Sequence, residues 1–184
     1  MKIKKNSAVV ILIFLTTAIH AQDSLTKKPF SFNTDLVSSY VWRGSLVDQT
    51  PNLQPYFSFS KNNFECGSWG SVAVNGDYSE LDLYAAFAPG KFAFMVTDYY
   101  VLSDNPEKNY FDYANKSTSH TIEGSVGFTV SEKVPLTLSA NTYFYGSDND
   151  SDTSGTRLYS SYVEASYSFS NLDLILGVTP WKGY

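Results

Sequence analysis

Apolar and polar residues alternate with a period of two along most of this chain, whereas the spacing of an amphipathic helix is nearly absent. Residues 80–88 give the clearest case, because Leu81 and Leu83 alternate there with Glu80 and Asp82. Such alternation is typical of β-strands with one apolar and one polar face. The pattern predicts an all-β fold with antiparallel strands at residues 30–44, 53–60, 64–74, 80–88, 92–102, 119–130, 134–145, 159–169 and 172–178.

The lengths of these nine segments and of their connections distinguish a membrane sheet from a soluble one. Most segments run for about 9–13 residues, whereas strands of globular proteins average about 5–6 and tilted membrane-crossing strands need about 9–11. The connections after the second, fourth, sixth and eighth segments are mostly short, and those after the first, fifth and seventh are longer and polar. This combination predicts an antiparallel up-and-down transmembrane β-barrel with its apolar face toward lipid.

Aromatic residues make up 16% of the chain, and many of them gather at the ends of predicted strands. In a membrane barrel we expect such amphipathic rings at the level of the lipid headgroups. A secreted soluble β-sandwich that acts as a binding module is the alternative, because its core would use the same alternating residues. The aromatic residues at strand ends include Tyr40, Trp42, Tyr99, Tyr100, Tyr143, Tyr145, Tyr159 and Tyr162.

The number of predicted strands bears on whether the barrel is complete. A bacterial single-chain barrel has an even number of strands and no open edge, because unpaired backbone groups in hydrocarbon cost several kcal/mol each. Nine is odd, so we expect the sequence to be a fragment of a barrel with a larger even number of strands, unless one strand is miscounted. The barrel domain is assigned to residues 30–184 and is expected to be incomplete at its C-terminus.

The start of the chain predicts export. A basic beginning precedes an apolar run, residues 8–15, that is too short to span a bilayer. Ala21 offers a small residue for cleavage, so residues 1–21 are interpreted as a signal peptide and residues 22–29 as a linker. Gln22 follows the cleavage point, where a lipoprotein would need cysteine. We therefore expect the mature protein in the cell outer membrane.

Charge and cysteine content narrow the possible partners. The formal net charge is −5, and removal of the signal peptide takes away lysines and no acids, so nucleic-acid binding is not expected. Cys66 is the only cysteine, so no internal disulfide can form. No cofactor is expected. The expected partners are outer-membrane lipid, lipopolysaccharide and the barrel-assembly machinery.

The polar positions of the predicted strands collect charged side chains on one face, which would line the barrel interior. In a structural interpretation, Arg43 and Lys91 offset the carboxylates and rigidify the barrel; in a functional one, the excess of acids favours passage of cations. We favour the structural role, because barrels of about eight strands are filled by their own side chains. The candidate interior residues are Asp35, Arg43, Glu80, Asp82, Tyr84, Glu123, Asn141 and Glu164, with Asn33 and Tyr162.

A barrel-embedded lipid hydrolase or acyltransferase is the enzyme alternative, and it would need a nucleophile, a base and an orienting group within hydrogen-bond reach. His120 is the only histidine after the signal peptide, and its parity places it on the face opposite Glu123 and Ser125. A triad of these three residues would straddle the sheet. We therefore expect no enzyme, and we expect His120 near an outer loop as an interfacial residue.

An acidic loop raises the question of a metal site. Asp148, Asp150 and Asp152 alternate like the first ligands of a calcium loop, but the glycine and the glutamate that an EF-hand requires are missing. A solvated surface loop without a metal is the interpretation that the sequence favours. Cys66 is expected to be a small lipid-facing or turn residue rather than a reactive thiol.

Several motifs occur in an order that resembles a known family. SSYVWRGSLVDQTPNLQPYFSFS resembles an opening strand, loop and second strand in which an aromatic-Arg-Gly motif precedes a loop with Gln and Pro. CGSWGSVAV and ELDLYAAF resemble the following hairpin, and DYYVLSDN resembles the end of the next strand. The family is Gcw_chp, an uncharacterised group of Gram-negative outer-membrane proteins, and the resemblance extends to about Thr179. It implies a barrel with further strands, but no established activity and no functional residues.

Overall fold

The structure, a computed structural model, describes residues 29–103, 109–114, 117–150 and 155–181. Within these residues the protein is all-β, and nine strands form one antiparallel sheet. The predictions of an all-β fold and of nine antiparallel strands are therefore confirmed. The nine strands are β1 (Phe30–Val37), β4 (Asn52–Lys61), β5 (Phe64–Ala73), β6 (Ser79–Phe87), β7 (Phe92–Tyr99), β8 (Thr121–Thr129), β9 (Leu136–Gly146), β12 (Ser161–Ser168) and β13 (Asp173–Val178).

Two further hairpins lie outside this sheet: β2 (Tyr40–Trp42) pairs with β3 (Ser45–Asp48), and β10 (Asn149–Asp150) pairs with β11 (Thr156–Arg157). No helix in the described part of the chain is long and apolar enough to cross a bilayer. The predicted signal peptide, and the linker as far as residue 28, fall outside the described residues.

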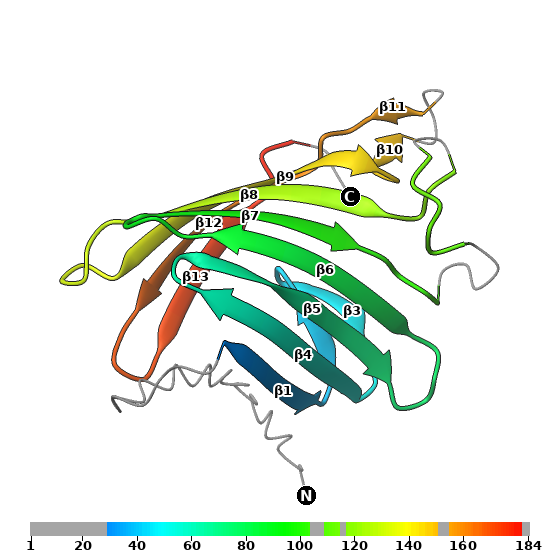
Figure 1. Cartoon of the computed structure of the whole chain (residues 1–184), viewed down its shortest axis with the longest axis horizontal. Helices are drawn as coiled ribbons and strands as arrows, with labels where there is room; N and C mark the ends of the chain where they lie inside the picture. The colour runs from blue at the N-terminus through cyan, green and yellow to red at the C-terminus, as the bar shows by residue number, and fades with distance from the viewer. Residues whose placement is uncertain (1–28, 104–108, 115–116, 151–154, 182–184) are drawn as a thin grey trace, which may run out of the picture.

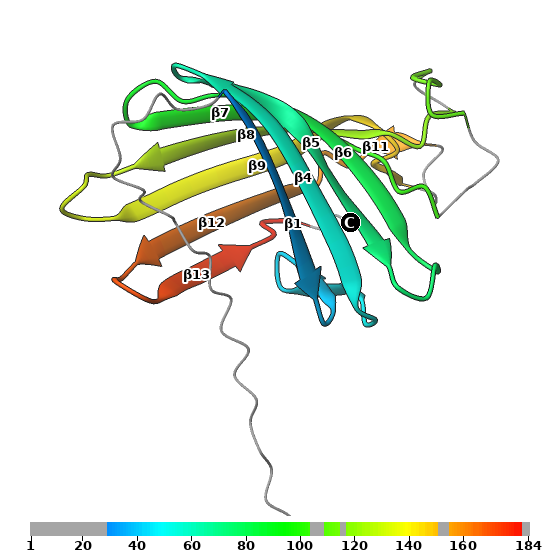
Figure 2. The ribbon, with the colours of Figure 1, turned by 60° about the horizontal axis from the view of Figure 1, so that its bottom comes forward.

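The nine strands follow the order β1-β4-β5-β6-β7-β8-β9-β12-β13, and the sheet curves so strongly that it has a concave and a convex face (Figure 1, Figure 2). Within the described residues β1 pairs only with β4, and β13 pairs only with β12. The sheet is therefore open along two edges. These nine strands do not close into a barrel, as expected for an odd number of strands, and a closed barrel with further strands stays a prediction.

Connections of different length lie at the two ends of the sheet, as the sequence predicts, except that the short connection 74–78 lies at the same end as the long ones. Because consecutive strands of the sheet run in opposite directions, alternate connections lie at the same end. The end at the left of Figure 1 is called the short-turn end below, and the opposite end is called the long-loop end. The short turns are residues 62–63, 88–91, 130–135 and 169–172, and the connections at the long-loop end are residues 38–51, 74–78, 100–120 and 147–160.

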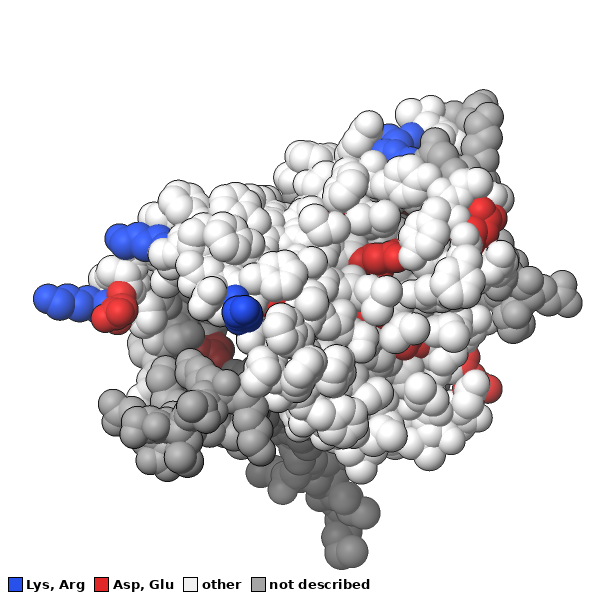
Figure 3. Space-filling model, in the orientation of Figure 1, with Lys and Arg blue, Asp and Glu red and all other residues white. Residues whose placement is uncertain are grey.

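The register of the sheet gathers large apolar side chains on the convex face. Directly opposed residues of antiparallel strands share a face. Phe64 opposes Phe87, Phe87 opposes Phe94, and Phe94 opposes Val126, so one apolar row crosses four strands. Figure 3 views this side of the sheet, where charged residues lie mostly toward the two ends and the band between them is mostly uncharged.

The distribution of buried residues is inverted relative to a soluble domain. Among the described residues, four hydrophobic residues are buried, whereas thirteen polar or charged residues are buried. Large hydrophobic side chains are exposed instead, with Phe32 and Leu176, for example, at 73% and 77% exposure. In soluble proteins the buried class is dominated by Ile, Val, Leu and Phe. The polar interior of this sheet is therefore the feature that any function must explain.

The predicted strand 30–44 is divided in the structure. β1 ends at Val37, and the chain then forms the β2–β3 hairpin, whose two-residue turn is Arg43 and Gly44. These residues have φ values of 50° and 78°, as a type I′ hairpin turn requires, and Gly44 adopts this conformation without steric cost. The prediction of one continuous strand here is wrong, because the chain leaves the strand at residues 38–39 and β2 then pairs with β3 instead of extending β1.

Candidate functional site

The β2–β3 hairpin folds over the concave face of the sheet (Figure 2). Tyr40 is 8% exposed, and its ring packs against Trp69 of β5 at 5.3 Å and against Tyr78 at 5.9 Å. Trp42 packs edge-on against Tyr99 of β7 at 5.8 Å. The expectation that Tyr40 and Trp42 lie at the lipid headgroups is therefore wrong: both rings anchor the hairpin to the inner side of the sheet.

An ion pair fixes the tip of this hairpin. Arg43 Nη1 donates to Glu123 Oε2 at 2.6 Å, and Nη2 donates to Oε1 at 2.8 Å, which is the bidentate geometry of a strong pair. Glu123 lies in β8 and its side chain is 1% exposed. Arg43 therefore reaches the concave face through the inward hairpin and not, as predicted, through its position in a strand of the sheet.

Aromatic rings and hydroxyl groups complete this ion-pair site. The Arg43 guanidinium lies 4.3 Å from the ring centroid of Trp42 and 4.9 Å from that of Tyr162. The Tyr99 hydroxyl donates to Glu123 Oε1 at 3.1 Å, and the Tyr99 ring packs against Tyr143 at 5.9 Å. Tyr99 and Tyr143 were expected among the headgroup-level aromatics. They lie on the concave face instead, where they pack around the Glu123 carboxylate.

The register also determines where the other candidate interior residues lie. Glu80, Asp82 and Tyr84 oppose Ser71, Trp69 and Gly67 of β5, on the same face as Glu123. Asn141 donates its side-chain amide to the Tyr162 carbonyl at 3.1 Å, and Glu164 opposes Ser139 and Gly177. Asp35 opposes Gln54, and Asn33 opposes Tyr56, on edge strand β1.

These candidates do not all meet at one point. Asp35 and Glu164 lie in β1 and β12, near the two open edges, whereas Glu80 and Asp82 lie in β6, near the middle of the sheet. Lys91 does not offset any of these carboxylates: its ammonium group is at the short-turn end and donates to the Val130 carbonyl at 2.7 Å. Of the two cations proposed to balance the interior acids, Arg43 alone makes such a contact within the described residues.

Glu65 is a site residue that the sequence interpretation missed. Its Oε1 accepts from the hydroxyls of Tyr56 and Tyr84, both at 2.8 Å, and its Oε2 accepts from Ser60 at 2.7 Å. Gly67 makes this cluster possible, because a Cβ there would lie 2.8 Å from the Tyr84 hydroxyl. The available signal was the alternation of Glu65 with its apolar neighbours at 64 and 66, although the glycines of this segment obscure the pattern.

His120 lies on the convex side, at the long-loop end, and is fully buried. Its Nδ1 lies 2.8 Å from Asp98 Oδ1, and its Nε2 lies 2.5 Å from the Tyr110 carbonyl oxygen. The Tyr113 ring stacks on the imidazole at 4.0 Å, and the Tyr113 hydroxyl donates to Asp98 Oδ2 at 2.7 Å. The predicted face of His120 agrees with the register, and it lies beside a long loop as expected, but its side chain is buried among protein groups rather than at an interface.

Both ring nitrogens of His120 have hydrogen-bond partners within this cluster. A general base needs one ring nitrogen free to accept a proton. A carbonyl oxygen can only accept, so Nε2 donates to Tyr110, and Nδ1 faces the Asp98 carboxyl group. The cluster thus ties Tyr110, Tyr113 and His120 to Asp98 of β7.

We expect His120→Phe to lower the free energy of unfolding by about 1–3 kcal/mol, because the Tyr110 carbonyl and Asp98 Oδ1 each lose their contact with the imidazole. Urea unfolding of the refolded full-length protein in detergent micelles measures this change. Phe111→Leu, in the same loop and 79% exposed, is the control and should stay within about 0.5 kcal/mol. Unchanged stability together with loss of a lipid-ester hydrolase activity would instead make His120 catalytic.

The acidic loop is organised differently from the expected solvated loop. Asp148 is fully buried, and its carboxylate accepts from the Ser160 backbone N–H at 2.9 Å and from the Ser160 hydroxyl at 2.6 Å. Asp150 lies in β10, and Asp152 lies outside the described residues. In the described ranges no group of three His, Cys, Asp or Glu residues could hold a metal. Cys66 is a free thiol that opposes Phe59 and Ala85 on the convex face.

Comparisons with protein-family models, with curated proteins and with solved structures found no match to this chain. The resemblance to the Gcw_chp family therefore stays a prediction. The features that bear on function are therefore the sheet itself and the different chemistry of its two faces.

Proposed function

We propose that this protein is an outer-membrane β-barrel, exported by its signal peptide, with a structural role or a role in the passive passage of small solutes. One observation carries the proposal: on the middle strands, polar side chains of the concave face such as Asp82 and Glu123 are buried, while apolar side chains of the convex face such as Phe94 are exposed. A transmembrane barrel has this distribution, because lipid surrounds its outside and water or polar side chains fill its inside.

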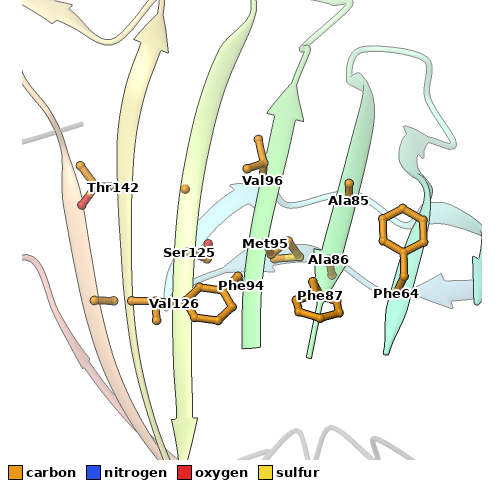
Figure 4. A pocket seen from close by; sticks show the side chains of 12 residues that line it. Phe64, Ala85, Ala86, Phe87, Phe94, Met95, Val96, Ser125, Val126 and Thr142 are labelled. Carbon is orange, nitrogen blue, oxygen red and sulfur yellow. The ribbon is translucent and has the colours of Figure 1, made fainter. Parts of the chain in front are cut away.

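The shape of the convex face supports a lipid environment. A shallow apolar groove crosses it, and Figure 4 shows the side chains of Phe64, Phe87, Phe94 and Val126 on neighbouring strands along this groove. Small residues form the next row, where Ala85 opposes Val96 and Val96 opposes Gly124. A surface of rings beside small residues can accommodate acyl chains. In water the same surface would be a large exposed apolar patch.

The open edges agree with this proposal only if further strands join β13 to β1 in the membrane. Unpaired N–H and C=O groups in hydrocarbon cost several kcal/mol each, so both edges need partners there. We propose that the short-turn end faces the periplasm and that the long-loop end faces outward, toward lipopolysaccharide, as in other outer-membrane barrels. The barrel-assembly machinery is the partner expected for insertion.

The inward hairpin favours a restricted interior. Tyr40, Trp42 and Arg43 occupy space on the concave face that a wide channel would leave to water. The remaining acids, such as Glu65 and Asp82, favour cations over anions among the solutes that can pass. In this proposal the side chains on the concave face both fill part of the barrel interior and determine its charge.

The two alternative functions have less support. A β-sandwich covers its apolar face with a second sheet, and within the described ranges only two short hairpins accompany the nine-stranded sheet. An enzyme would need a free base, and the His120 ring nitrogens are both engaged. We therefore retain the barrel without catalytic activity as the proposal.

Spin labels on neighbouring residues of one strand test the proposal. Val96 and Thr97 are consecutive in β7 and face opposite sides of the sheet. In a Cys66→Ser background, Val96→Cys labelled with a nitroxide and placed in phospholipid vesicles should collide mainly with oxygen, which concentrates in lipid. Labelled Thr97→Cys should show lower oxygen access and respond more to a water-soluble nickel chelate. If the label at 96 instead responds to the nickel chelate, the membrane proposal fails.

A further inference from the structure

A pocket of about 320 Å³ lies on the concave face, beside the anchored hairpin. It extends from Trp69 and Tyr99, against which the hairpin packs, to Glu65 near the short-turn end. Like the groove on the convex face, this pocket is shallow and open on one side. The side chains of Asp82 and Thr97 contribute to its lining.

Two buried polar atoms at this pocket have no hydrogen-bond partner. Asp82 is 5% exposed and Thr97 is 6% exposed. Among the described residues, Asp82 Oδ1 and Thr97 Oγ1 are the buried side-chain oxygen or nitrogen atoms that no donor or acceptor satisfies. Leaving a buried carboxylate oxygen unsatisfied is costly, so an unpaired atom at a pocket indicates a missing partner.

The charges around the pocket define what this partner must be. Glu65 accepts from three hydroxyl groups, and Glu80 accepts from the Tyr78 hydroxyl at 2.8 Å. Arg43, the cation that the described structure places on this face, is engaged by Glu123. A positively charged ligand is therefore the complement that Asp82 lacks.

The walls of the pocket make an organic cation a better complement than a metal ion. The rings of Tyr56 and Tyr84 stack at 6.0 Å, and Trp69 and Tyr99 line the pocket with them. Aromatic faces attract ammonium groups and also bind an apolar body. A divalent metal would need several oxygen ligands, and the described residues offer no group of three acids or other metal-binding side chains.

We propose that this pocket binds a small organic cation, a primary ammonium compound with an aromatic or alkyl body. The ammonium group pairs with Asp82 Oδ1 and donates to Thr97 Oγ1, while the body lies against Trp69 and the Tyr56–Tyr84 pair. The proposal rests on the proposed function, because the ligand reaches the pocket through the interior of the barrel.

Titration of the refolded full-length protein in neutral detergent micelles with benzylamine tests the site, by isothermal calorimetry. Benzyl alcohol, which has nearly the same shape without the charge, should bind at least about tenfold more weakly, because a charged hydrogen bond contributes about 1.5–3 kcal/mol. Asp82→Asn should weaken benzylamine binding by about tenfold or more, and Thr97→Val by about threefold. Asp35→Asn, on the same face at the sheet edge, should change it less than twofold.

Equal binding of the amine and the alcohol, or no binding of the amine, overturns the site, and this comparison needs no variant to fold. Equal effects of Asp82→Asn and Asp35→Asn overturn it as well, because a general negative field would then explain the binding. The spin-label measurement is independent of this titration. If the preference for the amine is lost while the label at residue 96 is exposed to lipid, only the pocket is rejected. If the preference is retained while the label at residue 96 is exposed to water, only the membrane barrel is rejected.

Discussion

Val126→Arg is expected to lower the free energy of unfolding in phospholipid vesicles by about 2–4 kcal/mol, because it places a charge on the lipid face near the bilayer midplane. Val126 lies within β8, in the apolar row that contains Phe94, and it is 41% exposed. A half-exposed valine on a soluble sheet would tolerate the same change with an effect of about 0.5 kcal/mol or less. Urea unfolding of the full-length protein in vesicles measures the difference.

Val134→Arg provides a matched control for this prediction. Val134 is 42% exposed, nearly the same as Val126, but it lies in the short turn 130–135. In a barrel this turn lies at the membrane surface, where an arginine costs little, so the variant should stay within about 1 kcal/mol of the parent protein. Equal effects of the two substitutions would mean that exposure alone determines the cost, and the convex face would then be in contact with water.

The period-two pattern predicted the strands of the sheet well wherever a strand lies between two other regular strands. In β6, Leu81 and Leu83 alternate with Glu80 and Asp82, and the register assigns the two sets to opposite faces. Long alternating segments carry this information locally, because side chains of a strand must point to opposite sides in turn. The number of strands in the sheet and their antiparallel order could therefore be predicted from the alternating segments.

The same pattern failed at residues 38–39, where the chain leaves the sheet without a break in alternation. Tyr40 and Trp42 continue the parity of β1, and periodicity alone cannot distinguish a strand that continues from a hairpin that folds back. The dipeptide Arg43-Gly44, whose positive φ values produce the turn, marks the hairpin but not residues 38–39, where the chain leaves β1. Gly at the second turn position was visible in the sequence, but a single glycine is a weak indication of a turn.

Partners across the sheet were the least predictable part of the candidate site. Arg43 and Glu123 are 80 positions apart, and their contact depends on the curvature of the whole sheet and on the inward hairpin. Asp98 and His120 meet because β7 and β8 are neighbours, although a long loop separates them in sequence. Composition and parity can assign such residues to a face, but pairing requires the three-dimensional arrangement.

The Arg43–Glu123 pair is the contact on which the arrangement of the concave face depends most. It fixes the hairpin tip against β8, and through Trp42 and Tyr99 it fixes one side of the pocket that contains Asp82 and Thr97. Because the Glu123 side chain is 1% exposed, bulk water cannot replace Arg43 as its partner without local rearrangement of the protein. Removal of the arginine therefore costs more than loss of an exposed ion pair would.

Arg43→Ala is expected to lower the free energy of unfolding by about 3–5 kcal/mol, because it leaves the Glu123 carboxylate buried and unpaired. Lys91→Ala, which removes an exposed cation at the short-turn end, should change it by about 0.5 kcal/mol or less. Urea unfolding in detergent micelles, followed by tryptophan fluorescence, measures both variants. An equal effect of the two would show that the hairpin is not held by this pair.

The double variant Arg43→Met/Glu123→Gln separates the cost of an unpaired charge from the contribution of the pair itself. Because neither residue remains charged, it should recover at least about half of the stability that Arg43→Ala loses. The released hairpin should also raise the conductance of the full-length protein in planar bilayers for both Arg43 variants, since the tip no longer occupies the interior. Recovery of stability with an unchanged conductance would mean that the ion pair stabilises the sheet without narrowing a passage.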